Sequence, residues 1–222
     1  MYQSKNNTQA HRLLVAAIAL GCALGTAAHA QLQLPGLNVT PPPTPTLITP
    51  PAGNTAFLVG HAQGTQGYVC LPTSAGGTSW TINSARPEAT LFTNVFGHPF
   101  QIITHFLSPD ANPNQNAPNP LPPGGSVTWQ SSLDTSRVWG QKVGSILAGS
   151  DPSCPNSGAI PCLLLQSIGN QQGPTGGQLL ADTTYIQRLN TNGGSAPTTA
   201  CTVGQTQLVP YTADYHFFHQ DE

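Results

Sequence analysis

The end of the chain alternates between two sets of positions with a period of two. Within 208–219 the first set, which is mostly apolar, consists of Val209, Tyr211, Ala213, Tyr215 and Phe217. A period of two is that of an extended strand with two different faces. The preceding run, 183–191, is rich in β-branched and aromatic residues and predicts a second strand. The last third of the chain is therefore expected to form two neighbouring strands.

Short strands separated by turns are predicted along the rest of the chain. No window holds a convincing apolar stripe with a period of 3.6, and 23 Gly with 22 Pro disfavour long helices. Regularly spaced short strands predict one all-β domain, an antiparallel β-sandwich or barrel with long loops and little helix. The apolar side chains expected in its core are Trp80, Ile82, Phe92, Ile102, Phe106, Trp129, Tyr211, Tyr215 and Phe217.

The region before this domain divides into two segments. Residues 1–30 predict a secretory signal peptide, because Lys5 and Arg12 flank the start of an apolar run and Ala28-His29-Ala30 fits the small-x-small cleavage rule. Residues 31–53 predict a solvated, proline-rich tether. The β-domain then covers residues 54–222. We expect a secreted or periplasmic protein with no membrane span after the signal is removed, because no later stretch has the ~20 apolar residues that a spanning helix needs.

One long segment interrupts the predicted strands. Residues 108–125 are rich in proline and asparagine, and structureless loops of this length are often functional or disordered. We favour disorder for this segment.

Charge is sparse in the predicted mature chain. After residue 30, the cations Arg86, Arg137, Lys142 and Arg188 stand against eight carboxylates, a balance of −4. Such a chain lacks the basic stripe that nucleic-acid binding requires and the clustered Lys and Arg that hold anionic membranes. Its polar surface must consist of Asn, Gln, Ser and Thr, which suits a neutral partner such as a glycan or a small neutral ligand.

The same region holds four cysteines, Cys70, Cys154, Cys162 and Cys201. An even number in an exported chain favours two disulfides, for which three pairings exist. A turn-rich loop between Cys154 and Cys162 is easily closed, and Cys70 then pairs with Cys201 by elimination. The spacings of a cysteine metal site are missing, and with every thiol paired none is left to act as a nucleophile.

Blocks at 64–70, 87–92, 159–165, 185–194 and 210–215 follow one another in a recognisable order along about residues 55–218. In these blocks the chain resembles one family of secreted bacterial and fungal proteins, known as the domain-of-unknown-function family 3455. The resemblance implies no activity, because none is established for the family. Members usually have a tryptophan where Cys162 stands, which fits a local Cys154–Cys162 bridge.

Some fungal members carry a malate dehydrogenase label, which this chain does not support. A dinucleotide site needs GxGxxG between a strand and a helix, whereas Gly60, Gly64 and Gly67 have other spacings and lead into no predicted helix. A GxSxG nucleophile elbow is missing as well. We expect no dinucleotide-dependent dehydrogenase and no cofactor.

Four residues remain as candidates for catalysis: Glu88, His105, Arg188 and Asp214. Glu88 precedes an apolar run, and a buried carboxylate must be paired or change its pKa. It can form an ion pair with Arg86 or Arg188, which we favour, or act as a general acid or base with His105. Arg188 and Asp214 come from the last two strands and can pair across them.

Histidine offers the weakest candidate site. His105 and His216 both lie within predicted strands, and a barrel can gather metal ligands from separate strands. We favour the alternative, in which each ring is hydrogen-bonded or exposed and binds no metal.

Two classes of function are consistent with these features. The first is a non-catalytic extracytoplasmic module that binds neutral polar ligands such as glycans. The second is a secreted hydrolase or metal-assisted enzyme that uses Glu88, His105, Arg188 or Asp214. Convergence of these four side chains in a cleft would favour the enzyme, and dispersion would favour the binding module.

Overall fold

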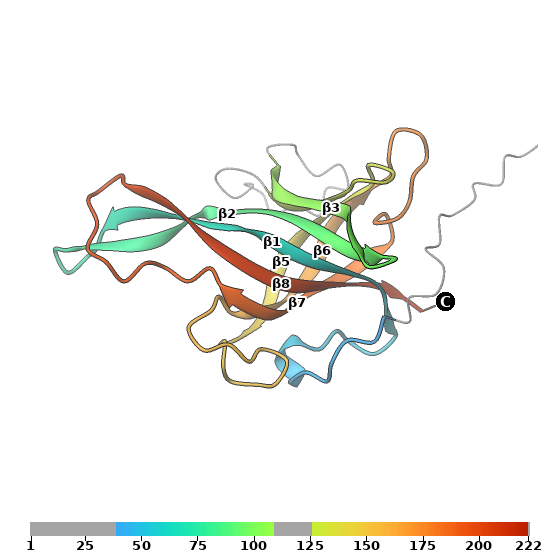
Figure 1. Cartoon of the computed structure of the whole chain (residues 1–222), viewed down its shortest axis with the longest axis horizontal. Helices are drawn as coiled ribbons and strands as arrows, with labels where there is room; N and C mark the ends of the chain where they lie inside the picture. Colours follow the sequence, from blue (N-terminus) through green and yellow to red (C-terminus); the bar gives the residue numbers. More distant parts are fainter. Residues whose placement is uncertain (1–38, 109–125, 222) are drawn as a thin grey trace, which may run out of the picture. The chain divides into compact units, whose positions relative to one another are not determined.

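The structure is a computed structural model that describes residues 39–108 and 126–221. The predicted signal peptide, the first part of the predicted tether and nearly all of the 108–125 loop lie outside these residues, as do the side chains of 83–86. Eight antiparallel strands in chain order form a closed barrel (Figure 1), which confirms the all-β prediction and selects the barrel. The strands are β1 (Asn54–Pro72), β2 (Thr78–Val95), β3 (His98–Ser108), β4 (Ser126–Ser131), β5 (Arg137–Ile146), β6 (Cys162–Gln171), β7 (Thr183–Gly193) and β8 (Thr206–Gln220).

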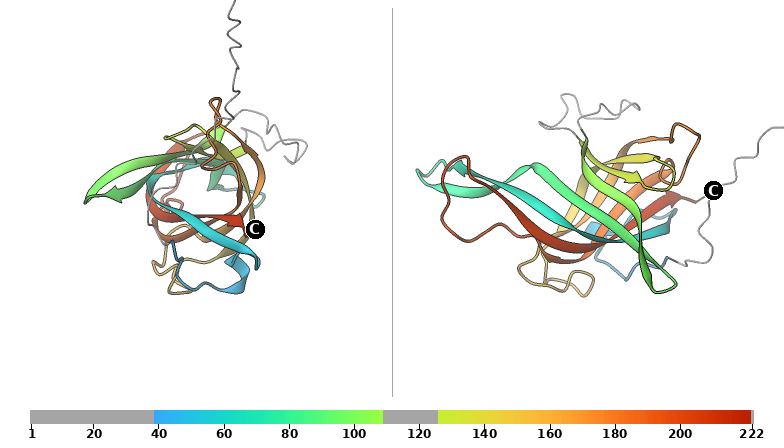
Figure 2. Two further views of the ribbon diagram at one scale, coloured as in Figure 1. Left: turned by 90° about the vertical axis from the view of Figure 1, so that its right-hand side faces the viewer. Right: turned by 45° about the horizontal axis from the view of Figure 1, so that its top comes forward.

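The barrel closes between its first and last strands. Their ladder runs from Asn54 opposite Gln220 to Val69 opposite Thr206, and the left view of Figure 2 looks into the resulting ring. Within the described ranges, no helix is long and apolar enough to cross a bilayer.

The interior follows the alternation of the last strand. Tyr211, Tyr215 and Phe217 are buried in the main apolar cluster, as predicted, and Ala213 from the same face is buried with them. The other strands contribute the rest of this cluster, which includes Leu58, Leu91, Ile102, Ile103, Trp129, Val138, Leu165 and Ile186. The apolar core therefore lies inside the barrel, as is usual for eight strands.

Two residues that were predicted in the core, Trp80 and Ile82, lie outside it, toward the end of the β1–β2 hairpin. β3 pairs with β2 only from Ala89 to Val95, so the earlier part of β2 continues beyond the barrel with β1 and the start of β8 (Figure 1). On this extension Ile82 is 54 % exposed, and Trp80 is half-buried with its Nε1 donating to the carbonyl of Thr199 at 3.0 Å. These two positions lie beyond the barrel, so its lumen does not cover their side chains.

A bulge changes the faces of β3. The register between β2 and β3 shifts at Leu91 and Phe92, and both Ile102 and Ile103 are buried as a result. Phe92 and Phe106 are half-buried rather than fully inside. Strict alternation cannot predict a bulge, because it inserts a residue without changing the composition of the strand.

The end of the predicted tether is packed against the barrel wall. A short 3-10 helix, η1 (Thr46–Ile48), buries Ile48 completely against a second apolar cluster that contains Cys154, Cys162 and Leu189. The Ile48 carbonyl accepts a hydrogen bond from Nε2 of Gln187 at 2.7 Å. Residues 46–48 are therefore packed against the barrel, whereas the sequence predicted a solvated tether there.

Both disulfides have the pairing predicted from the sequence. Cys70 is bonded to Cys201 across 131 residues, and Cys154 to Cys162 across 8. The first bridge holds the loop before β8 against β1, where Cys70 also exchanges backbone hydrogen bonds with Gly204 and Gln205. The second bridge is completely buried beneath η1.

Candidate functional site

The four residues predicted for catalysis lie in three separate places. His105 and Arg188 point into the barrel and are buried. Glu88 is exposed, and its neighbour Ala89 is the residue that faces the interior, opposite His105 on β3. Asp214 lies on the outer surface of β8. The structure therefore brings His105 and Arg188 together but does not gather all four.

Among the described residues Arg188 has no carboxylate partner, although the sequence allowed a pair with Glu88 or with Asp214. Arg188 lies opposite Tyr215 and Asp214 lies opposite Leu189, so Arg188 and Asp214 belong to opposite faces of the sheet. Within the described ranges, Arg188 forms no ion pair with Glu88 or with any other acid. The alternative pair of Glu88 with Arg86 involves a side chain outside the described residues.

His105 is held in the lumen as a neutral ring. Its Nδ1 lies 2.9 Å from the Thr128 carbonyl oxygen and must carry the proton, because the carbonyl only accepts. The ring stacks on Trp129 with 4.2 Å between centroids and 10° between planes. Burial lowers the pKa of His105 to about 3, and the Arg188 charge adds to this effect against the opposing Thr128 hydrogen bond.

Three tyrosines lie near Arg188. The hydroxyls of Tyr211 and Tyr215 lie 3.1 Å apart, and the Tyr68 hydroxyl donates to the Gly194 carbonyl at 2.6 Å. Burial raises the pKa of Tyr68, and burial together with Tyr215 raises that of Tyr211 well above its usual value. The nearby Arg188 charge lowers both pKa values without reversing either shift. The Tyr68 and Tyr211 hydroxyls therefore remain protonated in the folded protein.

A polar cluster lies on the outer surface of the β1–β8 ladder. Nδ1 of His61 is 2.6 Å from Oδ1 of Asp214, its direct cross-strand partner, and Nδ2 of Asn190 donates to Oδ2 of Asp214 at 2.7 Å. Asn190 has a φ of 49°, in the left-handed region, at a bulge in β7. In a neutral His61 ring, Nδ1 donates to this carboxylate and Nε2 is left as the acceptor.

His216 lies next to this cluster. Burial lowers its pKa to about 4, Asp214 opposes that shift, and His61 adds to it. Its Nδ1 has no hydrogen-bond partner. No group of three or more potential metal ligands occurs in the part of the chain that the structure describes.

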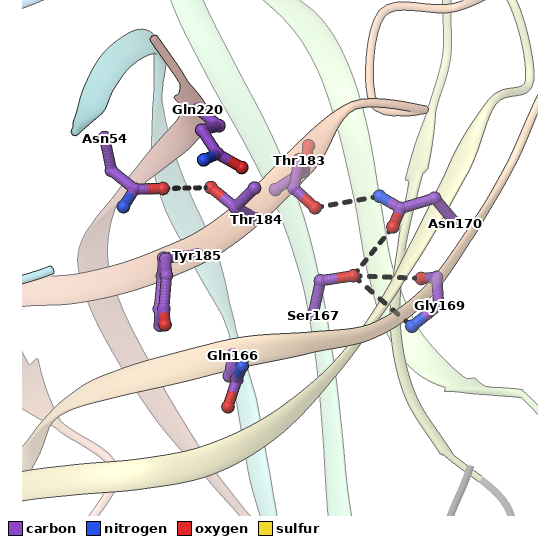
Figure 3. Close-up of a pocket in the computed structure, with 9 residues that line it drawn as sticks. All are labelled: Asn54, Gln166, Ser167, Gly169, Asn170, Thr183, Thr184, Tyr185 and Gln220. Carbon is purple, nitrogen blue, oxygen red and sulfur yellow. Dashed lines mark hydrogen bonds between the residues drawn. The ribbon is translucent and has the colours of Figure 1, made fainter. Parts of the chain in front are cut away.

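A hollow of about 430 Å³ opens where β6 and β7 separate (Figure 3). Their ladder ends at Gln166 opposite Tyr185, while β6 continues beside β5 as far as Gln171. The side chain of Asn170 bridges part of the gap: its Nδ2 donates to the carbonyls of Leu180 and Thr183, each at 3.0 Å. Two strands that part in this way leave backbone and side-chain polar groups facing the opening.

Uncharged polar groups line the hollow. Its lining residues are Asn54, Gln166, Ser167, Gly169, Asn170, Thr183, Thr184, Tyr185 and Gln220. Ser167 Oγ donates to Asn170 Oδ1 at 2.8 Å, and Thr184 Oγ1 donates to Asn54 Oδ1 at 2.6 Å (Figure 3). These bonds fix the walls of the hollow in one arrangement.

A comparison with family models identifies the chain's relatives. The model described as "Protein of unknown function (DUF3455)" matches residues 51–219, which is most of the chain. The chain is a DUF3455 protein. No curated protein and no solved structure matches it. The family description gives no activity, so a function for this DUF3455 protein has to be argued from the geometry.

Sequence reasoning missed several residues of these sites in the DUF3455 chain. His61 had no distinguishing neighbours, because its partner Asp214 is 153 residues away and faces it only after the barrel closes. Asn170 and Gln166 looked like ordinary surface amides. One usable signal existed for Asn190: it precedes Thr191-Asn192-Gly193 near the end of an otherwise regular strand, and Asn is among the residues that adopt positive φ most easily.

Proposed function

We propose that this protein is an exported, non-catalytic module that binds neutral polar ligands such as glycans in the hollow between β6 and β7. The observation that carries the proposal is the lining: amides, hydroxyls and one aromatic ring surround the opening, and none of the lining residues is charged. The two disulfides are compatible with an extracytoplasmic protein.

Several groups at the hollow are free to bind. The side-chain amides of Gln166 and Gln220 are exposed and form no hydrogen bond with any described residue. Oγ1 of Thr183 is buried at the same place and has no partner. Amide and hydroxyl groups of this kind can exchange hydrogen bonds with sugar hydroxyls, and the half-buried Tyr185 ring offers a surface on which a sugar can stack.

The size of the hollow agrees with this class of ligand. Binding pockets for small molecules have volumes of roughly 300–1,000 Å³, and the hollow lies toward the lower end of that range. A mono- or disaccharide is the largest neutral ligand that it would surround.

The test is a calorimetric titration of the purified protein with a panel of neutral mono- and oligosaccharides built on glucose, mannose and N-acetylglucosamine. The double variant Gln166→Ala/Gln220→Ala should weaken binding roughly tenfold, because each lost hydrogen bond is worth about 0.5–1.5 kcal/mol. Both residues are exposed, so the thermal midpoint should not move.

The matched control is Gln207→Ala. Gln207 is an exposed glutamine in the same strand as Gln220 and lies about 40 Å away along it, at ~3.3 Å per residue. Its variant should bind like the wild type. Failure of the whole panel to bind, or equal losses in the control and the double variant, would contradict the proposal.

A second function, hydrolysis, is favoured by the pair of His61 and Asp214. The carboxylate orients an imidazole that is 54 % exposed and has Nε2 available to take a proton from water. The predicted alternative using Glu88, His105, Arg188 and Asp214 is replaced here by His61 with Asp214, because the other three lie elsewhere.

Chromogenic neutral esters and glycosides separate the two functions. An enzyme would lose turnover in both His61→Gln and Asp214→Asn while its thermal midpoint stayed within a few degrees. A binding module would show no turnover above buffer in the wild type, and that result would remove the second candidate.

A further inference from the structure

Arg188 is a cation inside the barrel that has no counter-charge among the residues that the structure describes. It is 8 % exposed, its Nη2 donates to the Pro161 carbonyl at 2.8 Å, and its Nε has no partner. No Asp or Glu occurs among the buried side chains of the described residues, and Arg188 is in no ion pair there. A charge removed from water without a partner costs several kcal/mol.

The protein's own groups cannot remove this charge. A guanidinium stays protonated at any pH at which proteins fold. His105 is neutral, and the raised pKa values of Tyr68 and Tyr211 keep their hydroxyls protonated. The lumen around Arg188 therefore carries a net positive charge.

The same region also has more hydrogen-bond donors than it uses. Nε1 of Trp129 is buried without a partner. The Tyr211 and Tyr215 hydroxyls share one hydrogen bond, so the hydroxyl that accepts it still has its own O–H to donate. Unused buried donors are costly unless something accepts from them. A negatively charged acceptor would satisfy both the donors and the charge.

We propose that the barrel lumen binds a small monoanion, a halide or a short carboxylate, next to Nε of Arg188. Tyr215, the cross-strand neighbour of Arg188, and its partner Tyr211 supply the neutral donor. A charge-assisted hydrogen bond from a guanidinium to an anion is about twice as strong as a neutral one. An eight-stranded barrel has room inside for side chains or for one small ligand, so the anion must be small.

The thermal midpoint of the full chain tests this proposal. It is measured in sodium chloride, sodium acetate and sodium gluconate at one constant ionic strength, with chloride or acetate replacing gluconate stepwise. Gluconate is too large for the lumen. A bound anion raises the midpoint saturably, by roughly 5–10 °C when its concentration is about 100-fold above its Kd. Comparing chloride with acetate separates the halide from the carboxylate.

Arg188→Met removes the charge with little change in side-chain length. Its midpoint should be the same in all three salts, and in gluconate it should equal or exceed that of the wild type, because an uncompensated buried charge is gone. Lys142→Met is the matched control: it removes an exposed cation from β5 and should keep the wild-type response.

Chlorine-35 NMR of the wild type provides a second measurement that does not depend on the variant's folding. Bound chloride should broaden the line, and acetate should restore the narrow line if it competes for the site. No excess broadening together with equal midpoints in all three salts would overturn the proposal. An unchanged salt response in a folded Arg188→Met protein would place any anion elsewhere and overturn it too.

Discussion

The imidazole ring of His105 lies parallel to the indole ring of Trp129, with 4.2 Å between their centroids. The pair comes from β3 and β4, where the two residues are direct cross-strand partners. Because Nδ1 donates to the Thr128 carbonyl and the ring is 2 % exposed, the stack is built around a neutral histidine. Protonation of His105 would place a second charge in a lumen that already holds Arg188.

We therefore predict that acid destabilises the fold over a defined window. The pKa of His105 is about 3 and that of His216 about 4 in the folded state, against 6.5 when exposed. Between these values the unfolded chain binds more protons, so the free energy of unfolding falls as the pH drops below 6.5. Each histidine contributes at most about 1.4 kcal/mol per pH unit. Denaturant titrations between pH 3 and 7 measure the slope.

Removing one histidine separates its contribution. His105→Gln should flatten the slope between pH 3 and 6.5, whereas His98→Gln, at an exposed position at the start of β3, should leave it unchanged. A wild-type stability that is constant over this range would show that neither buried ring resists protonation.

The Trp129 ring also leaves no room for a side chain at position 140, which is Gly140. A Cβ at Gly140 would lie 2.8 Å from Cζ3 of Trp129, closer than real contacts allow. Gly140→Ala should therefore displace the indole from His105, cost about 1–3 kcal/mol as overpacked cores do, and shift tryptophan fluorescence. Gly77→Ala is the control, since its Cβ would meet only Thr73 Oγ1 at an ordinary 3.6 Å. Equal stability of the two variants would contradict the packing argument.

The pattern of residues was sufficient to predict an all-β domain and the two faces of β8 but not the register of the strands. Alternation along β8 correctly identified Tyr211, Tyr215 and Phe217 as interior because it is a local property of one strand. Contacts such as His61 with Asp214 depend on which strands meet and at what offset, and a bulge moves that offset by one residue. The same limit explains why a pair between Arg188 and Asp214 was possible from the sequence, whereas the two residues occupy opposite faces.

The predicted core also included residues that lie outside it, and the reason is different. Trp80 and Ile82 alternate with polar residues as a buried strand does, yet they lie where β1, β2 and β8 extend past the other strands. Alternation shows that a strand has two faces and does not show whether another layer covers either face. The sequence did not predict that Ile48 docks on the barrel, because a proline-rich segment has no periodic pattern of apolar residues.

The disulfides should contribute unequally to stability. In the chain-entropy account, a bridge that closes 131 residues is worth about 4–5 kcal/mol and one that closes 8 residues roughly 2–3 kcal/mol. Cys70→Ala/Cys201→Ala should therefore lower the free energy of unfolding more than Cys154→Ala/Cys162→Ala does. Guanidinium titrations of the two double variants measure the difference. The reverse order would mean that packing beneath η1, rather than loop entropy, dominates.

The turn between β2 and β3 can be improved. Phe96 and Gly97 form a two-residue hairpin loop between Val95 and His98, and their φ angles are 51° and 82°. Two positive φ values are typical of a type I′ turn, in which Asn-Gly is strongly preferred, because a left-handed conformation costs an ordinary L-residue roughly 1–2 kcal/mol. Phe96 is 98 % exposed, so its ring contributes almost no packing that a substitution would lose.

Phe96→Asn should therefore stabilise the protein by roughly 0.5–1 kcal/mol and raise its thermal midpoint by about 1–4 °C. Phe96→Ala is the matched control: it removes the same exposed ring without relieving the positive φ, so it should leave the midpoint close to that of the wild type. Differential scanning calorimetry compares the three proteins. If alanine stabilises as much as asparagine, the gain comes from removing an exposed aromatic ring, and the argument from turn geometry is wrong.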